Sequence, residues 1–306
     1  MSTPPPGPRI AFTVVVPTYA SSTSRLGECL AALAALDYPP DELEVLVVDD
    51  GSPAPPDPLV QSWKAKVPVR LLTIRHGGPS AARNAGAREA RGRWLAFTDD
   101  DCAPEAGWLR ALEGRLAADP RTAVGGLTLN DLPENRFSAA SQLLIHYLYD
   151  HFNGPGGVRF LTSNNLAVWT ETFRGSGGFD ETFHRTAAED REFCDRWVHL
   201  GHRLAFAADA VVRHRHELTL RRFWRQHLHY GRGAFVFHGV RARRAGRFRL
   251  EPPSFYARLL LRPWSDGLPA PIRTAALLAL SQLANAAGFA VEAATELGER
   301  RRPRRA

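Results

Sequence analysis

The sequence is poor in cysteine and lacks the features of several common protein classes. Its 306 residues contain three cysteines, Cys29, Cys102 and Cys194, which lie far apart and form no C-x-x-C pair. This spacing argues against a disulfide framework and against a zinc site, and it favours a reduced, cytoplasmic compartment. Residues 1–8 are rich in proline and lack an apolar core, so we expect a flexible leader and not a secretory signal.

Two common nucleotide-binding signatures are also missing. Residues 77–86 read GGPSAARNAG, which is neither the G-x-G-x-x-G pattern of dinucleotide-binding folds nor a P-loop. The glycines nevertheless precede a predicted helix at Pro79, and helix N-termini favour anions. Arg83 adds a planar donor suited to phosphate. The segment is therefore compatible with a phosphate site and equally with close packing of a helix on a sheet.

Positive charge is concentrated in the C-terminal half. The net charge is +7, and residues 213–249 contain eleven arginines and one acid, Glu217. Five more arginines lie within residues 300–305. A solvated basic surface with a disordered tail explains this distribution, and so does attraction to an anionic membrane face or a pyrophosphate-bearing acceptor. No recognised nucleic-acid motif accompanies the arginines, so we expect no nucleic-acid partner.

Strand-like and helix-like patterns alternate over residues 9–101. Short apolar runs predict four strands, at residues 12–16, 45–48, 69–74 and 94–98. Helical spacing and a proline typical of a helix start predict helices between them, at about 26–36, 57–66 and from 79 onward. Alternation of this kind indicates βαβ units and a mainly parallel sheet.

The chain is harder to assign beyond residue 101. We expect a helix to begin at Pro104 and a strand to cover residues 124–129. Residues 130–160 show weaker periodicity, and they predict a long irregular connection with an aromatic helical piece at 143–149. Loops of this length in compact domains are usually functional or mobile.

The C-terminal region changes in character after residue 253. Residues 274–291 carry no charge, but they are slightly short for a membrane span, which needs ~20 apolar residues. As a helix they would place polar side chains on one side and apolar ones on the other, Ser281, Gln282 and Asn285 against Leu277, Leu280 and Ala284. Two alternatives follow: an amphipathic helix packed on the domain, or a helix lying in a membrane interface.

Acidic residues follow two of the predicted strands. Asp49 and Asp50 come after the second strand, and Asp99, Asp100 and Asp101 come after the strand at 94–98. Ligands of open α/β sheets bind outside the carboxyl ends of parallel strands, so these acids should converge. Neighbouring carboxylates repel one another unless a cation offsets them, and oxygen ligands suit Mg²⁺ or Mn²⁺. A plain turn or a helix cap is the alternative explanation.

Two further groups of polar residues are candidates for function. Glu189 and Asp190 begin a predicted helix, where acids are favoured by the helix dipole whatever their role. Asp190 shares a stripe with Phe193 and Trp197, so we expect its carboxylate to face the body of the protein. His214 and His216 follow an apolar strand, and strand alternation places both imidazoles on one face.

Five motifs in order resemble those of the family 2 glycosyltransferases, which have a GT-A fold. They are P-T-Y at 17–19, V-V-D-D-G-S at 47–52, G-x-x-x-A-R-N-x-G at 78–86, F-T-D-D-D at 97–101 and G-G-F-D-E at 177–181, the last followed by Glu189-Asp190. The resemblance extends from about Val14 to His216. It implies transfer of a sugar from a nucleotide-diphosphate donor with inversion at the anomeric carbon. Thr98 stands where the family often has leucine.

The resemblance implies that the first two strand ends bind the nucleotide. Thr18, Tyr19 and Asp49 would hold the base, with Pro17 and Asp50 beside them. An aspartate at this edge can accept hydrogen bonds from a base or a ribose. The donor would therefore be a nucleotide-diphosphate sugar.

The resemblance also implies contacts along the rest of the donor. Arg83 would lie along the nucleotide, and Asn84 would support its turn. Asn164 and Asn165 precede the strand-like residues 166–168 and are candidates for contact with donor-sugar hydroxyls. A role in a turn is equally compatible with these two asparagines.

A metal site and a catalytic base complete the implied machinery. Asp101 would be the main ligand of Mg²⁺ or Mn²⁺, and Asp99 would meet the metal or the ribose, with Asp100 behind them. His214 or His216 would complete the metal site or touch the diphosphate. On the acceptor side, Asp190, next to Glu189, would be the general base that takes the proton from an acceptor hydroxyl.

The sequence thus predicts an α/β fold of GT-A type, a Rossmann-like mixed, mainly parallel sheet flanked by helices. We expect a glycosyltransferase domain at 9–250, with a nucleotide-binding half at 9–101 and an acceptor-binding half at 102–250, and a C-terminal helical extension at 251–306 with a basic tail. The Q-x-x-R-W string of processive polysaccharide synthases is absent, which favours addition of one sugar.

The acceptor predicted from this pattern is a hydroxyl of a cell-envelope polysaccharide or of a lipid-linked saccharide. The enzyme would be cytoplasmic, either free or peripheral at the cytoplasmic face of the membrane. The alternative function is a non-catalytic module that binds nucleotide sugars or polyanions. A module of this kind would have no turnover, and changing Asp190 to asparagine would leave its binding of the nucleotide sugar or polyanion unchanged.

Overall fold

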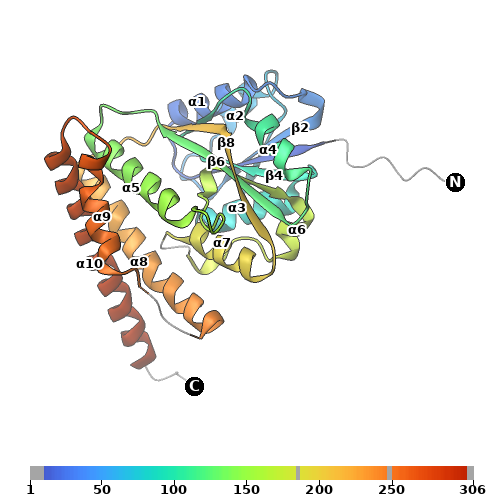
Figure 1. The fold of residues 1–306 in the computed structure, drawn as a ribbon. Coiled ribbons are helices and arrows are strands. Elements are labelled where there is room, and N and C mark those ends of the chain that lie inside the picture. The colour runs from blue at the N-terminus through green and yellow to red at the C-terminus, as the bar shows by residue number, and fades with distance from the viewer. Residues whose placement is uncertain (1–9, 184–186, 247–249, 302–306) are drawn as a thin grey trace.

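The computed structural model of the chain describes residues 10–183, 187–246 and 250–301. The predicted leader at 1–8 and residues 302–306 of the predicted basic tail lie outside the described residues. A central sheet with helices on both faces occupies one side of the molecule, and a group of long helices lies beside it (Figure 1). The chain therefore consists of a layered α/β body and a helical flank.

The sheet has eight strands in the order β3-β2-β1-β4-β7-β6-β8-β5. Six of them run parallel, and β7 and β5 run antiparallel to their neighbours. The strands are β1 (Phe12–Thr18), β2 (Leu43–Asp49), β3 (Val69–Thr73), β4 (Trp94–Phe97), β5 (Cys102–Pro104), β6 (Thr122–Asn130), β7 (Leu166–Trp169) and β8 (Arg203–His214). The predicted mixed, mainly parallel sheet is confirmed.

Helices cover both faces of the sheet. One face carries α1 (Thr23–Ala34), α2 (Asp57–Trp63) and α4 (Trp108–Leu116), and the other carries α3 (Pro79–Glu89), α6 (Thr170–Gly175) and α7 (Glu189–His199). Short 3-10 turns lie at Pro40–Glu42, Ser163–Asn165 and Glu181–Phe183. Val14 and Val16 of β1 point into the core under α1, α2 and α4, and Val15 points into the core under α3, α6 and α7. A strand covered on both faces is apolar at every position, which explains the unbroken apolar runs of the sequence.

Two sequence predictions beyond residue 101 are wrong. Pro104 does not begin a helix, because residues 102–104 form strand β5, which pairs antiparallel with the end of β8, and the helix begins only at Trp108. Residues 130–160 are not mainly irregular, because they contain the 17-residue helix α5 (Arg136–Phe152). The Asn135 side chain caps α5 by accepting hydrogen bonds from the backbone N–H groups of Phe137 and Ser138.

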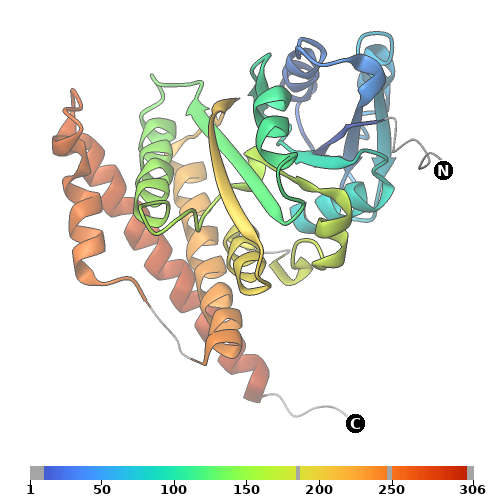
Figure 2. The same ribbon diagram turned by 45° about the vertical axis from the view of Figure 1, so that its right-hand side comes forward.

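The helical flank consists of α5 together with α8 (Leu220–Ala245), α9 (Pro253–Ser265) and α10 (Pro271–Arg301). Figures 1 and 2 show α8 and α10 side by side along their length. They can approach closely because glycines lie at the crossing: a Cβ at Gly231 would overlap the backbone of Asn285, and a Cβ at Gly288 would overlap the backbone of Leu228. The predicted C-terminal helical extension is confirmed, and it packs against α5 and α8.

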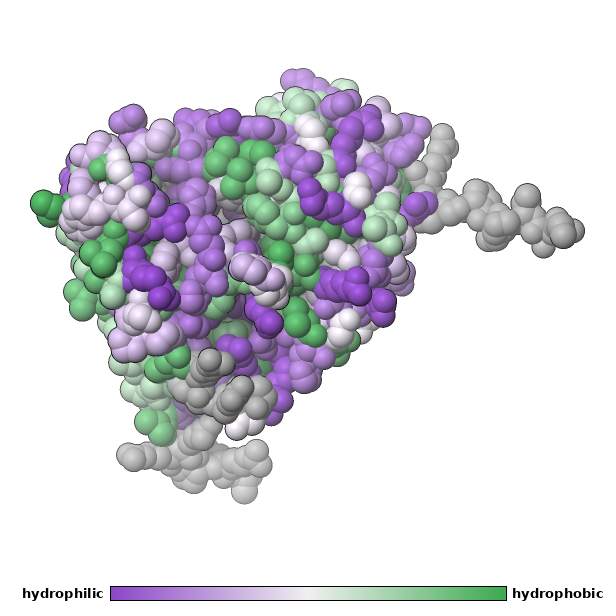
Figure 3. Space-filling view, viewed as in Figure 1, coloured by the Kyte–Doolittle hydropathy of each residue, from purple (hydrophilic) through white to green (hydrophobic). Residues whose placement is uncertain are grey.

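Apolar surface is exposed on α9 and α10. Leu261, Trp264, Ile272 and Leu283 are all exposed, and Figure 3 shows apolar residues along the edge of the molecule where these helices lie in Figure 1. Among the described residues one segment, Pro271–Gly298, is long and apolar enough to cross a membrane, with a mean hydropathy of 1.4 and 22% of it buried. That measure rests on length and composition alone.

Candidate active site

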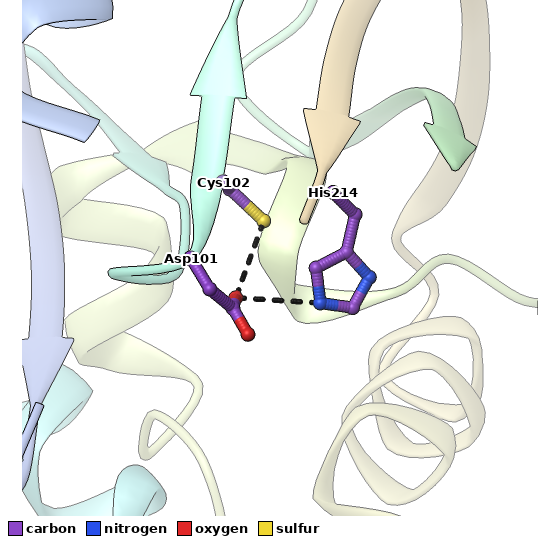
Figure 4. Close-up of side chains that lie close together, drawn as sticks. All are labelled: Asp101, Cys102 and His214. Carbon is purple, nitrogen blue, oxygen red and sulfur yellow. Dashed lines mark hydrogen bonds and ion pairs between the residues drawn. The ribbon is translucent and has the colours of Figure 1, made fainter. Parts of the chain in front are cut away.

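Asp99, Asp100 and Asp101 form an acid triplet, and the short strand β5 that follows it brings Asp101 against the end of β8. Because Cys102 pairs with His214 in register, Asp101 Oδ1 lies 3.3 Å from His214 Nε2 (Figure 4). The rings of His214 and His216 stack with their centroids 4.7 Å apart, so both imidazoles lie on one face, as strand alternation predicts. The structure thus pairs Asp101 directly with His214, and the ring of His216 stacks on that of His214.

Two neighbouring acids of the triplet have opposite protonation behaviour. Burial opposes ionisation of Asp101, but His214, followed by His216 and Arg25, outweighs burial and lowers the pKa of Asp101 to about 2. Burial dominates at Asp100 and raises its pKa to about 6, although the Thr18 hydroxyl donates to Asp100 at 2.6 Å. Asp101 is therefore ionised more readily than Asp100.

The residues around Asp101 fit a divalent cation of the Mg²⁺ or Mn²⁺ type. Ligand atoms of Asp101, Cys102 and His214 all lie within 4.8 Å of one another. Burial and the nearby acids raise the pKa of the Cys102 thiol well above its usual value, so Cys102 stays a thiol and is a poor ligand. A carboxylate and an imidazole remain; the carboxylate oxygens suit these ions, and the imidazole is the less typical donor of the two.

Arg83 connects the acid triplet to helix α7. Its guanidinium lies 2.6 Å from Asp99 Oδ1 and 3.1 Å from Glu189 Oε1, and its side chain is almost fully buried. The two carboxylates raise the pKa of Arg83 even though burial lowers it. The sequence predicts Arg83 along the nucleotide, and in the structure two of its nitrogen atoms already bind acids. This geometry favours a role in positioning Asp99 and Glu189.

Asn84 fixes the segment that leads to α7. Its amide nitrogen donates to the Phe179 carbonyl at 2.8 Å and to Glu181 Oε1 at 2.9 Å, and its oxygen accepts from the Phe179 N–H at 2.8 Å. Gly178 has a φ of 67°, and a Cβ there would overlap Asn84 Oδ1. The motifs at 78–86 and 177–181 are therefore two halves of one contact.

The ends of β1 and β2 leave one buried acceptor atom open. Asp50 accepts from the N–H groups of Gly77 and Gly78 at 2.7 and 2.8 Å, so its carboxylate holds the loop that precedes α3. Asp49 is fully buried, and its Oδ1 accepts from the Ser52 N–H at 3.1 Å. Asp49 Oδ2 is buried and has no hydrogen-bond partner within residues 10–183, 187–246 and 250–301. A ligand donor at Oδ2 would satisfy it.

An exposed aromatic side chain lies beside this edge. Tyr19 is 49% exposed, and its ring stacks on that of His76 with centroids 4.3 Å apart. Pro17 pairs in register with Val48 and is half-buried. The predicted base-binding residues Thr18, Tyr19 and Asp49 thus come from two adjacent strand ends.

Asp190 lies in a cavity together with residues from the strand ends. The cavity has a volume of ≈ 330 Å³, and its lining includes Asp190, Asp99, His214 and Asn164. Burial, followed by the charge of Glu189, raises the pKa of Asp190 to about 7, while nearby arginines oppose the shift. A carboxylate with this pKa can accept a proton near neutral pH, which is what a general base requires.

The two predicted sugar-binding asparagines have different surroundings. Asn164 lines the cavity, and its side chain lies near Thr128 Oγ1, at 3.5 Å, and Cys102 Sγ, at 3.7 Å. Asn165 accepts from Trp108 Nε1 at 2.9 Å and donates to the backbone carbonyls of β6 and β8, so it joins three elements. The structure therefore brings Asn164 to the cavity, whereas Asn165 is engaged in the core.

The cavity also contains residues that the sequence analysis did not select. They come from the helical flank and include Phe152, Tyr230, Tyr256, Gln282 and Asn285. One signal was visible in the sequence, because Gln282 and Asn285 form the polar side of an otherwise uncharged helix. The direction in which that side faces depends on the packing of α10 against α8, which the sequence does not encode locally.

Known proteins share this fold. A mannosyltransferase from Pyrobaculum calidifontis, solved with GDP-Man and Mn2+, aligns with a TM-score of 0.58 and 24% identity over 96% of this chain and 82% of that one. TarS of Staphylococcus aureus, solved with UDP-GlcNAc, aligns with a TM-score of 0.53 and 18% identity over 94% of this chain and 92% of that one. These similarities confirm the predicted GT-A type of fold.

Sequence comparison extends the similarity from fold to family. The model of glycosyl transferase family 2 matches residues 13–174, which is just over half of the chain. The pre-mycofactocin glycosyltransferase of Mycobacterium tuberculosis is 31% identical over 240 residues, covering 76% of this chain and 48% of that protein. The chain thus spans about half the length of this relative. Fold, family model and relative agree, and the chain belongs to glycosyl transferase family 2.

Proposed function

We propose that this glycosyltransferase is metal-dependent and inverting, and that it adds one sugar from a nucleotide-diphosphate donor to a hydroxyl of a cell-envelope saccharide or lipid-linked acceptor. The observation that carries the proposal is the cavity in which the Asp190 carboxylate lies together with Asp99 and His214. An acceptor hydroxyl in this cavity can meet a base at one end and the donor at the other.

The chemistry requires one proton transfer and one displacement. Asp190 takes the proton of the acceptor hydroxyl while the acceptor oxygen attacks the anomeric carbon. The bond from that carbon to the diphosphate oxygen breaks on the opposite face, so the configuration inverts and the nucleoside diphosphate leaves with the bonding electrons. A divalent cation held by Asp101 and His214 would supply positive charge at the leaving group.

The nucleotide would be held at the ends of β1 and β2. Asp49 Oδ2 offers an acceptor to a base or ribose donor, and the exposed ring of Tyr19 offers a surface on which a base can stack. The two structural relatives described above bind GDP-Man and UDP-GlcNAc, so the fold accommodates both purine and pyrimidine nucleotides. We therefore propose the class of donor and leave its base and sugar open.

Replacing the base tests the proposal directly. Asp190→Asn should keep donor binding and lower turnover by about 10²–10⁴-fold, the usual contribution of a general base. Asp195→Asn is a matched control, because Asp195 is on the same helix and binds Arg241 and Arg244 outside the cavity lining. The product's anomeric configuration, measured by NMR, checks inversion.

Two results would refute this function. Full turnover in Asp190→Asn would remove the assigned base, and product with retained configuration would exclude the single displacement. If neither the wild-type chain nor its variants turn over any nucleotide sugar that they bind, the alternative of a non-catalytic binding module gains support.

We further propose that the exposed apolar surface of α9 and α10 contacts the cytoplasmic face of an anionic membrane. Ile272 and Leu283 lie on the outward stripe of α10, and the exposed Arg258 and Arg273 add positive charge beside the apolar side chains. The arginines at 300–305 add sequence-level positive charge at the end of the same helix. The extension at 251–306 would then face the membrane, next to the glycosyltransferase domain at 9–250.

Vesicle binding tests the membrane proposal. The full chain should co-sediment with vesicles that contain phosphatidylglycerol and not with phosphatidylcholine vesicles. The double variant Ile272→Asp/Leu283→Asp should reduce this binding, whereas Val198→Asp, an exposed apolar position on α7, should not. Absence of binding by the intact chain would contradict the proposal.

A further inference from the structure

Helix α10 contributes two amide side chains to the cavity lining. Gln282 and Asn285 line the cavity that contains Asp190, whereas Leu283 is 64% exposed. In an ordinary surface helix, amides face water and leucines face the protein. Helix α10 also buries apolar side chains, Leu278 and Ala284 among them, but it places these two amides in the cavity lining, where a ligand can approach them.

One of these amides lacks a hydrogen bond. Asn285 Oδ1 is shielded from water, and no donor in the described part of the chain reaches it. A buried amide oxygen is normally paired, so the missing partner of Asn285, a residue of the cavity lining, points to a donor that a ligand would bring. Gln282 donates from Nε2 to Ser281 Oγ at 3.0 Å, which orients its amide from within the same helix.

The crossing of α8 and α10 fixes the position of these amides. Any Cβ at Gly231 would overlap the backbone carbonyl of Asn285, and any Cβ at Gly288 would overlap the carbonyl of Leu228. The two helix backbones are therefore in direct contact at the level of Asn285. Such close contact leaves α10 little freedom to rotate, and Asn285 stays in the cavity lining.

The same cavity has an apolar wall. Leu148 and Phe152 come from α5, and Phe255 and Tyr256 come from α9. The Tyr147 hydroxyl donates to the Phe255 carbonyl at 2.7 Å, which fastens α9 to α5. Hydroxyl groups placed against such a wall would lose water without gaining hydrogen bonds.

We propose that the acceptor has an apolar body, an aromatic ring or an aliphatic chain, joined to the part that bears the reacting hydroxyl. The apolar body packs on Leu148, Phe255 and Tyr256, and the amides of Gln282 and Asn285 orient the polar part. The proposal rests on the function given above, because it takes the hydroxyl next to Asp190 as the attacking group. The helical flank then selects the acceptor.

Three glucosides that differ in their aglycone test the proposal. Methyl, phenyl and octyl β-D-glucopyranoside, the last below its critical micelle concentration, are titrated into the full chain by calorimetry. We expect the phenyl or the octyl compound to bind at least tenfold more tightly than the methyl compound. Tighter binding of the phenyl compound identifies a ring, and tighter binding of the octyl compound identifies a chain. Equal affinity for all three overturns the proposal.

Variants on the two sides of α10 assign the residues. Asn285→Leu should weaken binding of the preferred glucoside at least fivefold, and Leu283→Asn on the outward side of the same helix is the matched control. Tyr256→Ala, at a position 39% exposed and therefore tolerant of truncation, should lower the preference over the methyl compound. Unchanged affinities in both Asn285→Leu and Tyr256→Ala would overturn the assignment.

Donor hydrolysis without acceptor separates this inference from the proposed function. The wild-type chain should show slow metal-dependent hydrolysis of a nucleotide sugar when no glucoside is present. If hydrolysis and donor binding are present but the aglycone has no effect, the acceptor inference alone fails. If no nucleotide sugar binds or reacts, the proposed function fails with it.

Discussion

The donor-side strand ends and the acceptor-side helices differ in how their polar groups are satisfied. At the strand ends most of them bind one another: Asp50 holds the loop before α3, Asn84 holds the segment before α7, and Arg83 binds two acids. On the helical flank, Asn285 Oδ1 is unpaired and much of the surrounding wall is apolar. The donor side is therefore held together mainly by its own polar contacts, with Asp49 Oδ2 left without a partner, whereas the acceptor side offers a largely apolar surface.

Removing the Asp101 carboxylate should have the largest effect on the donor side. Asp101→Asn should lower turnover by about 10²–10³-fold, because positive charge would no longer be held at the leaving diphosphate. It should also abolish the thermal stabilisation that Mn²⁺ gives in the presence of nucleoside diphosphate. Metal-dependent rates and melting curves of both proteins are the measurements.

Cys102→Ser is the matched control for Asp101→Asn. Its thiol is adjacent to Asp101 but stays protonated, so its replacement should leave metal dependence intact. Loss of metal dependence in Cys102→Ser, with retention in Asp101→Asn, would reverse the assignment of the ligands.

Arg83→Ala should test whether the donor side is held together by its own charges. The variant leaves Glu189 almost buried and Asp99 partly buried without their shared cation, and we expect a loss of about 2–3 kcal/mol in the free energy of unfolding. Because Arg83 also lowers the pKa of Asp190, the acid limb of activity should move to higher pH. Urea unfolding and a pH–rate profile measure the two effects.

Arg83→Lys keeps the charge and should lose less stability than Arg83→Ala. A lysine cannot reach two carboxylates with a planar fork, so part of the loss remains. An Arg83→Ala protein with wild-type stability and an unshifted acid limb would show that Arg83 is free to bind the nucleotide and does not position the acids.

The parallel half of the fold could be predicted because its information is local. Val14, Val15 and Val16 are apolar on both faces of the strand, and acids follow where the strands end. The contact between the end of β1 and the acids after β4, which Thr18 makes with Asp100, then follows from parallel pairing. The same local information did not reveal β5, since three residues with a proline show no strand period and the partner of Cys102, His214, is 112 positions away.

Side-chain partners and helix orientation depended on contacts that no local pattern carries. Arg83 meets Glu189 across 106 positions of sequence, which turned an expected phosphate ligand into a link between two acids. Only the piece of helix α5 at 143–149 was predicted; the full helix touches the sheet and three other helices, contacts that no local pattern carries. Gly231 and Gly288 let α8 and α10 approach closely at Asn285. From the sequence alone, nothing shows that these two glycines lie at a helix crossing.

Adding a methyl group where α8 crosses α10 should weaken acceptor binding and leave donor binding unchanged. Gly231→Ala would force α8 and α10 apart at Asn285, and we expect a loss of about 1–3 kcal/mol in the free energy of unfolding, as in other overpacked contacts. The KM for the acceptor should rise while donor affinity stays unchanged. Gly298→Ala is the control, because a Cβ there meets open space on the same helix. Equal losses of donor and acceptor affinity would contradict the separation of the two regions.

Asp190 lies where the two regions meet and should give opposite pH dependences in activity and in stability. As a base it must be ionised, so kcat/KM should rise through pH 7, the pKa that burial gives it, and level off above. The folded state holds this proton more tightly than the unfolded chain does. Its stabilising contribution is therefore fully present below about pH 4 and is lost as the pH rises through 7.

The stability difference between wild type and Asp190→Asn isolates this contribution. Asparagine does not titrate, so from pH 5 to pH 8 the wild type should lose about 1–2 kcal/mol relative to the variant, an amount reduced by the partial exposure of Asp190. Urea unfolding of both proteins at the two pH values measures it. A constant difference would mean that Asp190 is ionised at both pH values, and the acid limb of activity would then belong to another group.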